Sequence, residues 1–468
     1  MPGVPFMQQV PPGVRPAAPP HRPQLPPMPP ANGLGFALFI LVNLALFIRP
    51  ADIIPALQGM EIYQYLILSC LAISFPAVLA RLAPEQLERS PIDVCVLLLL
   101  PIIVISHGIH SQFADAWEEG FRFFKIQIYY FLLVSLVTTP GRLRTFTSFL
   151  VLFSAVTTLI SILDHVKVIQ LPRPAVEPGS RIFVDPDRMY GPGIFSDPND
   201  ICVLIAANLL LLLGRMTDKQ AGALRIFWLV PLAIFGVGFY LTQSRGGLIA
   251  VMGGLGVMAV LRWGWNRAIM LGALGLPLLL VLLAGRMTAI STHTNTGQER
   301  IELWNAGLVM FKENPLFGVG QDRYHLEAGH VAHNSFMQQF ADTGFFGGLL
   351  YLGAVLLAVW GLARHTAAAP GRRQMVPRVI IDPGYRQMHP FLAGAMTAYA
   401  GGMLTLTMNL LVTTYAFLGL ASVFLERAET TPPPDRQKWD GNLVLRLVLL
   451  SMTFLIGMFL FVRVTYRP

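Results

Sequence analysis

The run Phe345-Phe-Gly-Gly-Leu-Leu-Tyr-Leu-Gly-Ala-Val-Leu-Leu-Ala-Val-Trp-Gly-Leu362 contains no charged side chain. A helix rises about 1.5 Å per residue, so this run extends roughly 27 Å, close to the ~30 Å hydrocarbon core of a bilayer. Its side chains do not alternate between apolar and polar, as the strands of a membrane barrel do. The run therefore predicts a helix, which satisfies its own backbone hydrogen bonds in lipid.

Apolar runs of the same character recur along the chain. Its 468 residues are 54% hydrophobic and 13% charged, with a mean hydropathy of +0.57, whereas a soluble domain carries about 25% charged residues. We expect an all-α, polytopic transmembrane helical bundle of about 12–13 spans. The candidate spans are 34–48, 62–82, 92–109, 126–137, 146–163, 200–213, 226–241, 246–261, 268–284, 345–362, 391–411, 415–424 and 443–462.

Residues 1–33 differ in composition from everything that follows. They are rich in proline and poor in charge, which favours extended, solvated conformations and gives no core. We expect a disordered cytoplasmic leader at 1–33 and a transmembrane domain over 34–468.

The distribution of basic residues predicts the orientation. Most lysines and arginines of the short loops fall on one side of the predicted spans, the side of the N-terminus. Basic residues favour the cytoplasmic side of a membrane. The loop at 164–197, Arg245 and the polar segment 285–344 are then predicted to share the outer face. The net charge of +8 has the same origin, so we expect no nucleic-acid partner.

Other common kinds of site are disfavoured. Cys70, Cys95 and Cys202 lie in apolar segments, so no disulfide framework is indicated. His325, His330 and His333 lack the spacing of a zinc helix, and we expect no metal and no cofactor. Gly318 and Gly320 form a lone G-x-G without a preceding strand, which indicates a tight turn rather than a nucleotide site.

An acidic cluster in the loop before the span at 200–213 offers a second metal hypothesis. Asp185, Asp187 and Asp197 could hold a divalent ion. However, Asp197-Pro198 has the pattern of an N-cap followed by proline at the first helical position. Asn199 and Asp200 then fall in the first turn. The sequence favours a capped helix over a metal site.

Three polar features are predicted to meet at the outer face. The first is Thr242-Gln-Ser-Arg-Gly-Gly247, in which Arg245 ends a span and two glycines permit close backbone approach. An arginine that merely reaches the interface is the alternative.

The second feature is a helix within the segment 285–344. Thr296 and Glu299 form a capping box, and Asn314-Pro315 ends the helix. Apolar side chains recur at helical spacing from Arg300 onward, which predicts an amphipathic helix along the membrane surface. A packed loop helix with a solvated arginine is the alternative.

The third feature is His333-Asn334, which precedes a predicted helix. Asn334 or Ser335 suits an N-cap. The positive potential of a helix N-terminus favours a neutral imidazole, which can accept a proton as a general base. A histidine that only caps or packs is the alternative.

Two arginines and one histidine beside one leaflet suggest the handling of a phosphorylated membrane lipid. The guanidinium fork of Arg245 or Arg300 binds phosphate oxygens in bidentate fashion and keeps its charge at any relevant pH. Arg122 and Lys125, at another predicted outer edge, are weaker candidates for the same task.

The chain resembles the O-antigen ligase and O-antigen polymerase family of bacterial envelope glycosyltransferases. The resemblance covers roughly residues 190–425, with 285–344 as the outer catalytic loop. Four pieces carry it: Gly193-Ile-Phe-Ser-Asp-Pro-Asn199, Thr242-Gln-Ser-Arg-Gly-Gly247, Arg300 with Trp304 leading to Asn314-Pro-Leu-Phe-Gly-Val-Gly320, and His333-Asn334 leading to Gly344.

The resemblance implies an enzyme that moves a glycan from undecaprenyl diphosphate to an acceptor hydroxyl, with no nucleotide sugar and no obligatory metal. Arg245 and Arg300 would hold the diphosphate and stabilise it as it leaves. His333 would orient or deprotonate the acceptor hydroxyl, with inversion at the anomeric carbon. Asn334 and Asn199 are further substrate-binding candidates within the matching motifs.

The acceptor stays open. It is either another lipid-linked glycan, as in a polymerase, or a lipid or protein anchor, as in a ligase. A transporter or flippase of a lipid-linked glycan is the alternative function. Transporters tend to carry ionisable groups at mid-membrane depth, whereas the predicted spans here hold Asn43, Asn208 and Asn409 but almost no charge.

Overall fold

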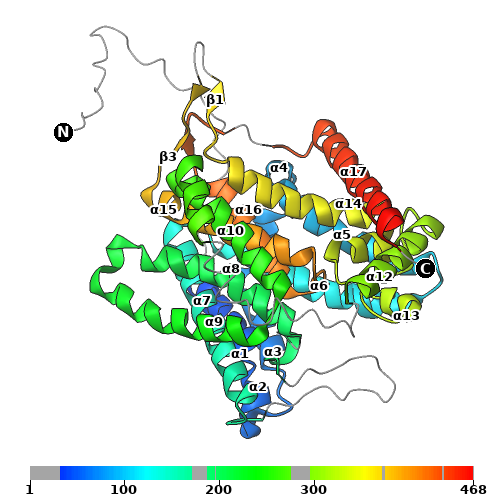
Figure 1. Cartoon of the computed structure of the whole chain (residues 1–468), viewed down its shortest axis with the longest axis horizontal. Coiled ribbons are helices and arrows are strands. Elements are labelled where there is room, and N and C mark those ends of the chain that lie inside the picture. The colour runs from blue at the N-terminus through cyan, green and yellow to red at the C-terminus, as the bar shows by residue number, and fades with distance from the viewer. Residues whose placement is uncertain are drawn as a thin grey trace.

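The computed structural model describes residues 32–170, 187–195, 197–275, 296–370, 375–434 and 437–466. Within them the chain is a bundle of helices (Figure 1), so the predicted all-α class is confirmed. The leader predicted at 1–33 lies almost wholly outside the described residues. The only strands described are two short antiparallel ladders, β1 (Ala369–Pro370) with β2 (Met375–Val376) and β3 (Val379–Ile380) with β4 (Thr430–Thr431).

The helices of the first half include the largely buried α8. Their bounds are α1 Gly33–Ile48, α2 Pro50–Ile53, η1 Pro55–Leu57, α3 Ile62–Arg81, α4 Pro84–Arg89, α5 Pro91–Gly108, α6 Phe113–Leu136, α7 Pro140–His165, η2 Gly193–Phe195, α8 Pro198–Met216, η3 Lys219–Trp228, α9 Leu229–Thr242 and α10 Arg245–Trp263.

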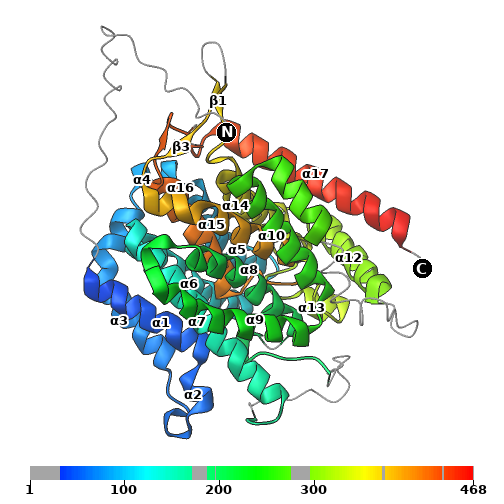
Figure 2. The same ribbon diagram turned by 60° about the vertical axis from the view of Figure 1, so that its left-hand side comes forward.

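The helices of the second half include one long kinked helix, α14. The bounds here are α12 Thr296–Glu313, α13 Tyr324–Ala328, α14 Ser335–Arg364, α15 Pro383–Met403, α16 Val412–Arg427 and α17 Gly441–Thr465. In Figures 1 and 2 the strand ladders lie toward one end of the bundle, α12 and α13 lie away from them, and α17 runs along the outside.

Eight helices in the described part of the chain are long and apolar enough to cross a membrane. They are Ile62–Arg81, Pro91–Gly108, Pro140–His165, Pro198–Met216, Gly222–Thr242, Arg245–Trp263, Ser335–Arg364 and Gly441–Thr465, and each contains or overlaps one predicted span. This length and composition make the chain a multi-pass membrane protein.

The other predicted spans have a more varied outcome. The runs at 34–48, 126–137 and 415–424 are helical in α1, α6 and α16, but they are not among the eight. The run at 391–411 leaves the helix after Met403, where α15 ends. The run at 268–284 is helical up to residue 275 and continues beyond the described residues.

The bundle is packed closely enough for helix backbones to touch. Most of α8 is buried, and α7, α9, α10 and α15 contact it. A Cβ atom added at Gly254 on α10 would lie 2.6 Å from the carbonyl oxygen of Gly394 on α15. Small residues at such crossings are typical of membrane helix packing.

A sealed ion cluster ties α3, α5 and α16 together. The Arg81 side chain is 0% exposed, and its Nε donates to Asp93 at 2.7 Å. Arg81 also pairs with Glu426. The hydroxyls of Tyr130 and Ser422 each donate to Asp93 at 2.6 Å. Each charge is therefore matched inside the bundle.

A kink in α14 separates its first nine residues from its long apolar span. At Gly344 the backbone has φ 66° and ψ −162°, and a Cβ there would collide with the backbone of Leu316 and Phe317. Phe345 N donates to Pro315 O at 2.8 Å beside the kink. Only glycine fits this backbone and this contact. The turn at Gly318 and Gly320, predicted from the G-x-G, is confirmed by φ values of +70° and +113°.

Candidate active site

Helix α12 brings Arg300 to the bundle. It begins at Thr296 and ends before Asn314-Pro315, so the predicted stop is confirmed. The predicted apolar face is buried, because Trp304, Leu308 and Phe311 pack against the core. α12 contacts α14 and α17. It is thus a packed helix rather than one lying free on the membrane surface, and Arg300 stands one turn before Trp304.

His333 lies in a loop that α12 and α14 hold from both sides. Asn334 caps α14, since its side-chain oxygen accepts from Phe336 N and Met337 N, each at 3.1 Å. Trp304 Nε1 on α12 donates to Ala332 O at 2.8 Å. His333 itself has φ 47°, a left-handed conformation that histidine adopts more often than most residues. Its backbone is therefore fixed in space.

His333 lies in a positive and poorly solvated environment. Burial, the charge of Arg300 and the neighbouring His330 together lower the pKa of His333 to about 4, while Asp197 opposes them. The rings of His330 and His333 lie 4.8 Å apart. The neutral imidazole expected from the helix N-terminus is supported, but burial and Arg300 are its causes. The sequence brought His330 forward only as a metal-ligand candidate, whereas in the structure it adjoins the proposed base.

Arg188 joins two of the sequence motifs and was missed by sequence reasoning. Its Nε donates to Thr242 O at 2.9 Å, and a terminal nitrogen donates to Asn199 Oδ1 at 2.8 Å. Arg188 thus connects the motif at 193–199 with that at 242–247. Its position in the loop before α8, nine residues before Asp197, is the signal that could have pointed to it.

Arg300 belongs to the same electrostatic group. Burial lowers the pKa of Arg300, Asp197 counters this, and the like charge of Arg188 lowers it further. Asp197 also caps α8, because its side chain accepts from Asn199 N at 2.6 Å. The N-cap predicted at Asp197 is confirmed. Asp197 therefore affects the pKa of both Arg300 and His333, and Arg188 acts on Arg300 as well.

Arg245 begins α10 beside this group. Ser244 caps the helix by accepting from Gly247 N at 3.1 Å, and the Arg245 side chain is exposed. The close approach predicted for the two glycines is confirmed: a Cβ at Gly246 would lie 2.7 Å from Thr405 Oγ1, and one at Gly247 would collide with Cys202. Arg245 is three residues after Thr242, whose carbonyl oxygen accepts a hydrogen bond from Arg188.

Arg122 and Lys125 lie on α6 with partners of their own. Arg122 donates to Asp322 at 3.0 Å, and Lys125 lies 5.1 Å from the ring of Phe121. Arg323 donates to Asp115 at 2.6 Å nearby. These pairs tie α6 to the turn after Gly320. Among the described residues, no contact joins Arg122 or Lys125 to His333 or Arg300.

The buried Asp342 orders that turn. Its carboxylate accepts from Tyr324 N and Asp322 N, each at 3.1 Å, and from Gln338 Nε2 at 3.0 Å. The hydroxyl of Ser335, the residue after the cap, donates to Leu406 O at 2.6 Å. The first turns of α14 are therefore held on several sides. Within the part of the chain that is described, no group of three His, Cys, Asp or Glu side chains could hold a metal ion.

Comparison with known proteins supports the resemblance found in the motifs. Residues 230–352 match the family model described as O-antigen ligase. The matched segment contains Arg245, Arg300 and His333 and ends within α14, whereas Arg188 and Asn199 precede it. No curated protein matches the chain. The match supports the O-antigen ligase family and a ligase-type glycan transfer in a membrane, from a lipid-linked glycan to an acceptor.

Proposed function

From the O-antigen ligase match at 230–352, we propose that the chain transfers a glycan from undecaprenyl diphosphate to an acceptor hydroxyl. The transfer takes place at the periplasmic face of a bacterial inner membrane. The observation that carries this proposal is that the neutral His333 lies close to the charged Arg300, near the first turn of α14. A base and an anion-binding group next to each other are the two parts that such a transfer requires.

The arginines hold the diphosphate. Arg188 is near enough to Arg300 for its charge to lower the pKa of Arg300. A diphosphate bound between the two guanidinium groups relieves their repulsion. Arg245 is the third candidate, because it opens α10, where the helix N-terminus also attracts anions. Guanidinium forks match phosphate oxygens in bidentate geometry. Asn199 and Asn334 remain substrate-binding candidates. Asn199 accepts a hydrogen bond from Arg188, and Asn334 caps α14 beside His333.

His333 takes the proton of the acceptor. As the acceptor oxygen bonds to the anomeric carbon, its proton passes to the imidazole, and the bond from that carbon to the diphosphate breaks. The electron pair leaves with the diphosphate, whose charge the arginines stabilise. Attack from the side opposite the leaving group inverts the anomeric carbon.

The bound substrate also adjusts the base. The Arg300 charge contributes to lowering the pKa of His333 to about 4, which is low for a base that works near neutral pH. A diphosphate on Arg300 offsets that charge and raises the pKa of His333. The imidazole then becomes most basic when the donor is in place.

The proposed chemistry requires no metal ion or cofactor. Diphosphate is a good leaving group, and two or three guanidinium charges supply the stabilisation that a divalent ion gives in other phosphate enzymes. Arg122 and Lys125, at the far side of the 320–324 turn, could contact the glycan or lipid rather than the diphosphate. The acceptor is a lipid, a glycan or a protein hydroxyl.

Reconstitution tests the proposal. The purified protein in liposomes receives a lipid diphosphate-linked glycan, and the products are sized. A ladder of longer chains indicates a polymerase, and one transfer to a new anchor indicates a ligase. His333→Ala should abolish transfer while the protein remains folded. His325→Ala, an exposed histidine of the preceding helix α13, is the matched control and should retain it. Full transfer by the His333 variant would overturn the assignment of the base.

A further inference from the structure

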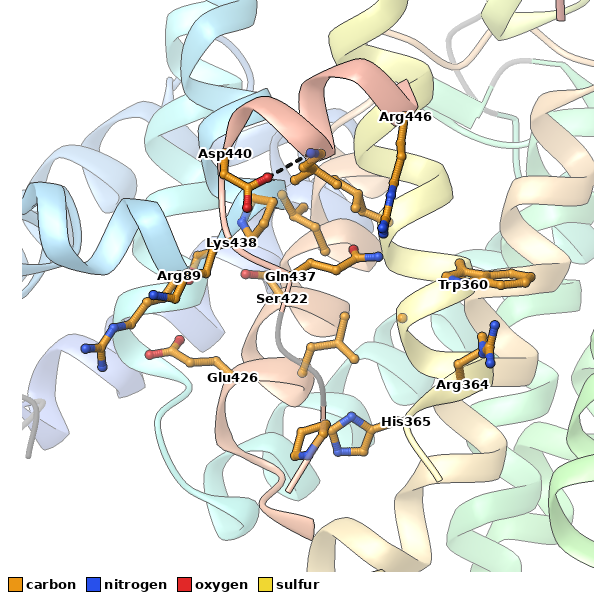
Figure 3. Close-up of a pocket in the computed structure, with 18 of the residues that line it drawn as sticks. Arg89, Trp360, Arg364, His365, Ser422, Glu426, Gln437, Lys438, Asp440 and Arg446 are labelled. Atoms are coloured by element: carbon orange, nitrogen blue, oxygen red, sulfur yellow. Dashed lines mark hydrogen bonds between the residues drawn. The ribbon is translucent and has the colours of Figure 1, made fainter. Parts of the chain in front are cut away.

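A cavity of about 530 Å³ opens at the end of the bundle remote from His333. It lies between the start of α5, the last turns of α14, the end of α16 and the first turns of α17 (Figure 3). From Gly344 to Arg364, α14 extends roughly 30 Å, the thickness of a bilayer core. The cavity and His333 therefore lie at opposite membrane surfaces.

Helix α17 independently shows that the cavity and the candidate active site are far apart. Its first turns carry Arg446, which lines the cavity. Near its end, the ring of Phe461 lies 5.9 Å from that of Trp304 on α12. The cavity is thus distinct from the candidate active site, and its function does not depend on the one proposed above.

The lining of the cavity is strongly basic. The basic side chains around it are Arg89, Arg364, Arg378, Lys438 and Arg446. Only two carboxylates line it, and both have structural partners. Glu426 pairs with the buried Arg81, and Asp440 caps α17 by accepting from Leu443 N at 2.8 Å. The positive charge of the lining therefore exceeds what its own carboxylates neutralise.

Two of these arginines stand on the walls that face each other. In Figure 3 Arg446 extends from α17 into the space between α17 and α14, and Arg364 stands beside Trp360 on α14. The Arg364 guanidinium lies 5.0 Å from the ring centre of Trp360. Among the described residues, no carboxylate forms an ion pair with Arg364 or Arg446. Two forked donors thus line the same cavity from different helices.

The same cavity borders on lipid. Trp360 is 55% exposed although it lies on a membrane-spanning helix. One turn along α17 from Arg446, Leu449 and Leu450 are 58% and 47% exposed. Tryptophan at the end of a span marks the membrane interface, and exposed leucines on a spanning helix contact acyl chains. The cavity joins a basic pocket to an apolar wall.

We propose that this cavity binds the phosphate of an anionic membrane phospholipid. Arg364 and Arg446 contact the phosphate, Gln437 and Lys438 contact the rest of the headgroup, and the acyl chains run along Trp360 and the outer face of α17. Basic pockets between membrane helices have the chemistry that recognises anionic headgroups. A soluble phosphate would fit the arginines but not the apolar wall.

Native mass spectrometry of the full, delipidated protein tests this proposal. The protein is titrated with phosphatidylglycerol and, separately, with phosphatidylcholine of the same acyl chains. We expect tighter binding of phosphatidylglycerol. The double change Arg364→Gln with Arg446→Gln should weaken that binding by about tenfold or more. Arg463→Gln, an exposed arginine at the other end of α17, is the matched control and should leave it unchanged.

Three results would overturn the proposal. They are equal binding of the two lipids, unchanged phosphatidylglycerol binding by the double variant, and displacement of the lipid by inorganic phosphate alone at low millimolar concentration. The last would identify a soluble anion as the ligand. Should the double variant unfold, the Arg364→Gln and Arg446→Gln single variants are each titrated, and each should show a smaller loss in the same direction.

Discussion

Two arginine clusters of this protein, one around Arg81 and one around Arg300, have opposite designs. Around Arg81, which is 0% exposed, the guanidinium pairs with two carboxylates and donates to the hydroxyls of Ser90 and Ser422 inside the bundle. Around Arg300, the favourable charge of Asp197 is set against the like charge of Arg188, and the third neighbour is the neutral His333. The first cluster has its charges matched by the protein itself. The second has positive charge that a polyanionic substrate can neutralise.

The difference suggests that one cluster contributes to the stability of the fold and the other to ligand binding. A buried charge that loses its partner is costly, so every member of a sealed cluster contributes to folding. A charge held near the surface with incomplete compensation costs some stability and provides binding energy for a ligand of opposite sign. The Arg81 cluster therefore joins helices, whereas the Arg300 cluster is suited to bind a diphosphate.

The largest effect on folding is expected from Arg81→Met. It removes the cation that Asp93 and Glu426 share. Arg427 still lies 3.8 Å from Glu426, but Asp93 is left buried without a cation, which should cost roughly 3–5 kcal/mol of the free energy of unfolding. Thermal unfolding in detergent measures the loss. Arg463→Met, on an exposed arginine, is the control and should leave the melting temperature within error. An equally stable Arg81 variant would show that the sealed cluster does not hold the helices together.

The complementary change is Arg300→Gln. It should lower the rate of glycan transfer by about 10²–10³, the usual loss when a group that stabilises developing charge is removed. The melting temperature should not fall, because the change removes a charge that burial and Arg188 already disfavour. Lys312→Gln in the last turn of α12 is the matched control. Loss of stability as large as in the Arg81 variant would erase the distinction between the two clusters.

Local signals in the sequence predicted most of the long apolar helices and two of their caps. Asp197 was predicted as one N-cap and either Asn334 or Ser335 as the other, and the side chains of Asp197 and Asn334 accept the expected backbone hydrogen bonds. The apolar face around Trp304 predicted which side of α12 is buried. These features depend on neighbours one or two turns away, so spacing alone identifies them.

Features that depend on distant segments were not predictable in the same way. The kink at Gly344 exists because the backbone at 316–317 packs against it. Arg188 became a site candidate only when Asn199 and Thr242 were brought to it. Arg122 was predicted to handle phosphate from its position at an outer edge, yet Asp322, two hundred residues later, pairs with it. Spacing carries no information about such contacts.

The smallest expected effect is a change in the titration of His333. Diethyl pyrocarbonate modifies neutral imidazole, and mass spectrometry locates the product at His333. In the wild-type protein the modification should have its midpoint near pH 4, because burial and Arg300 lower the pKa of His333. Arg300→Gln should move the midpoint up toward the ordinary histidine value of about 6.5, since one of the causes is removed. Modification of the exposed His325 corrects for reagent activity at each pH.

The same shift has a defined effect on stability. Unfolded His333 gains its proton near pH 6.5, whereas folded His333 gains it only near pH 4. The unfolded state therefore binds more protons within that window, and stability falls as the pH drops through it. Arg300→Gln should reduce this loss, while Lys312→Gln should not alter it. A midpoint that stays near pH 4 in the Arg300 variant would mean that burial and His330, without Arg300, keep His333 neutral. The coupling by which a bound diphosphate makes His333 more basic would then fail, even if both residues are needed for transfer.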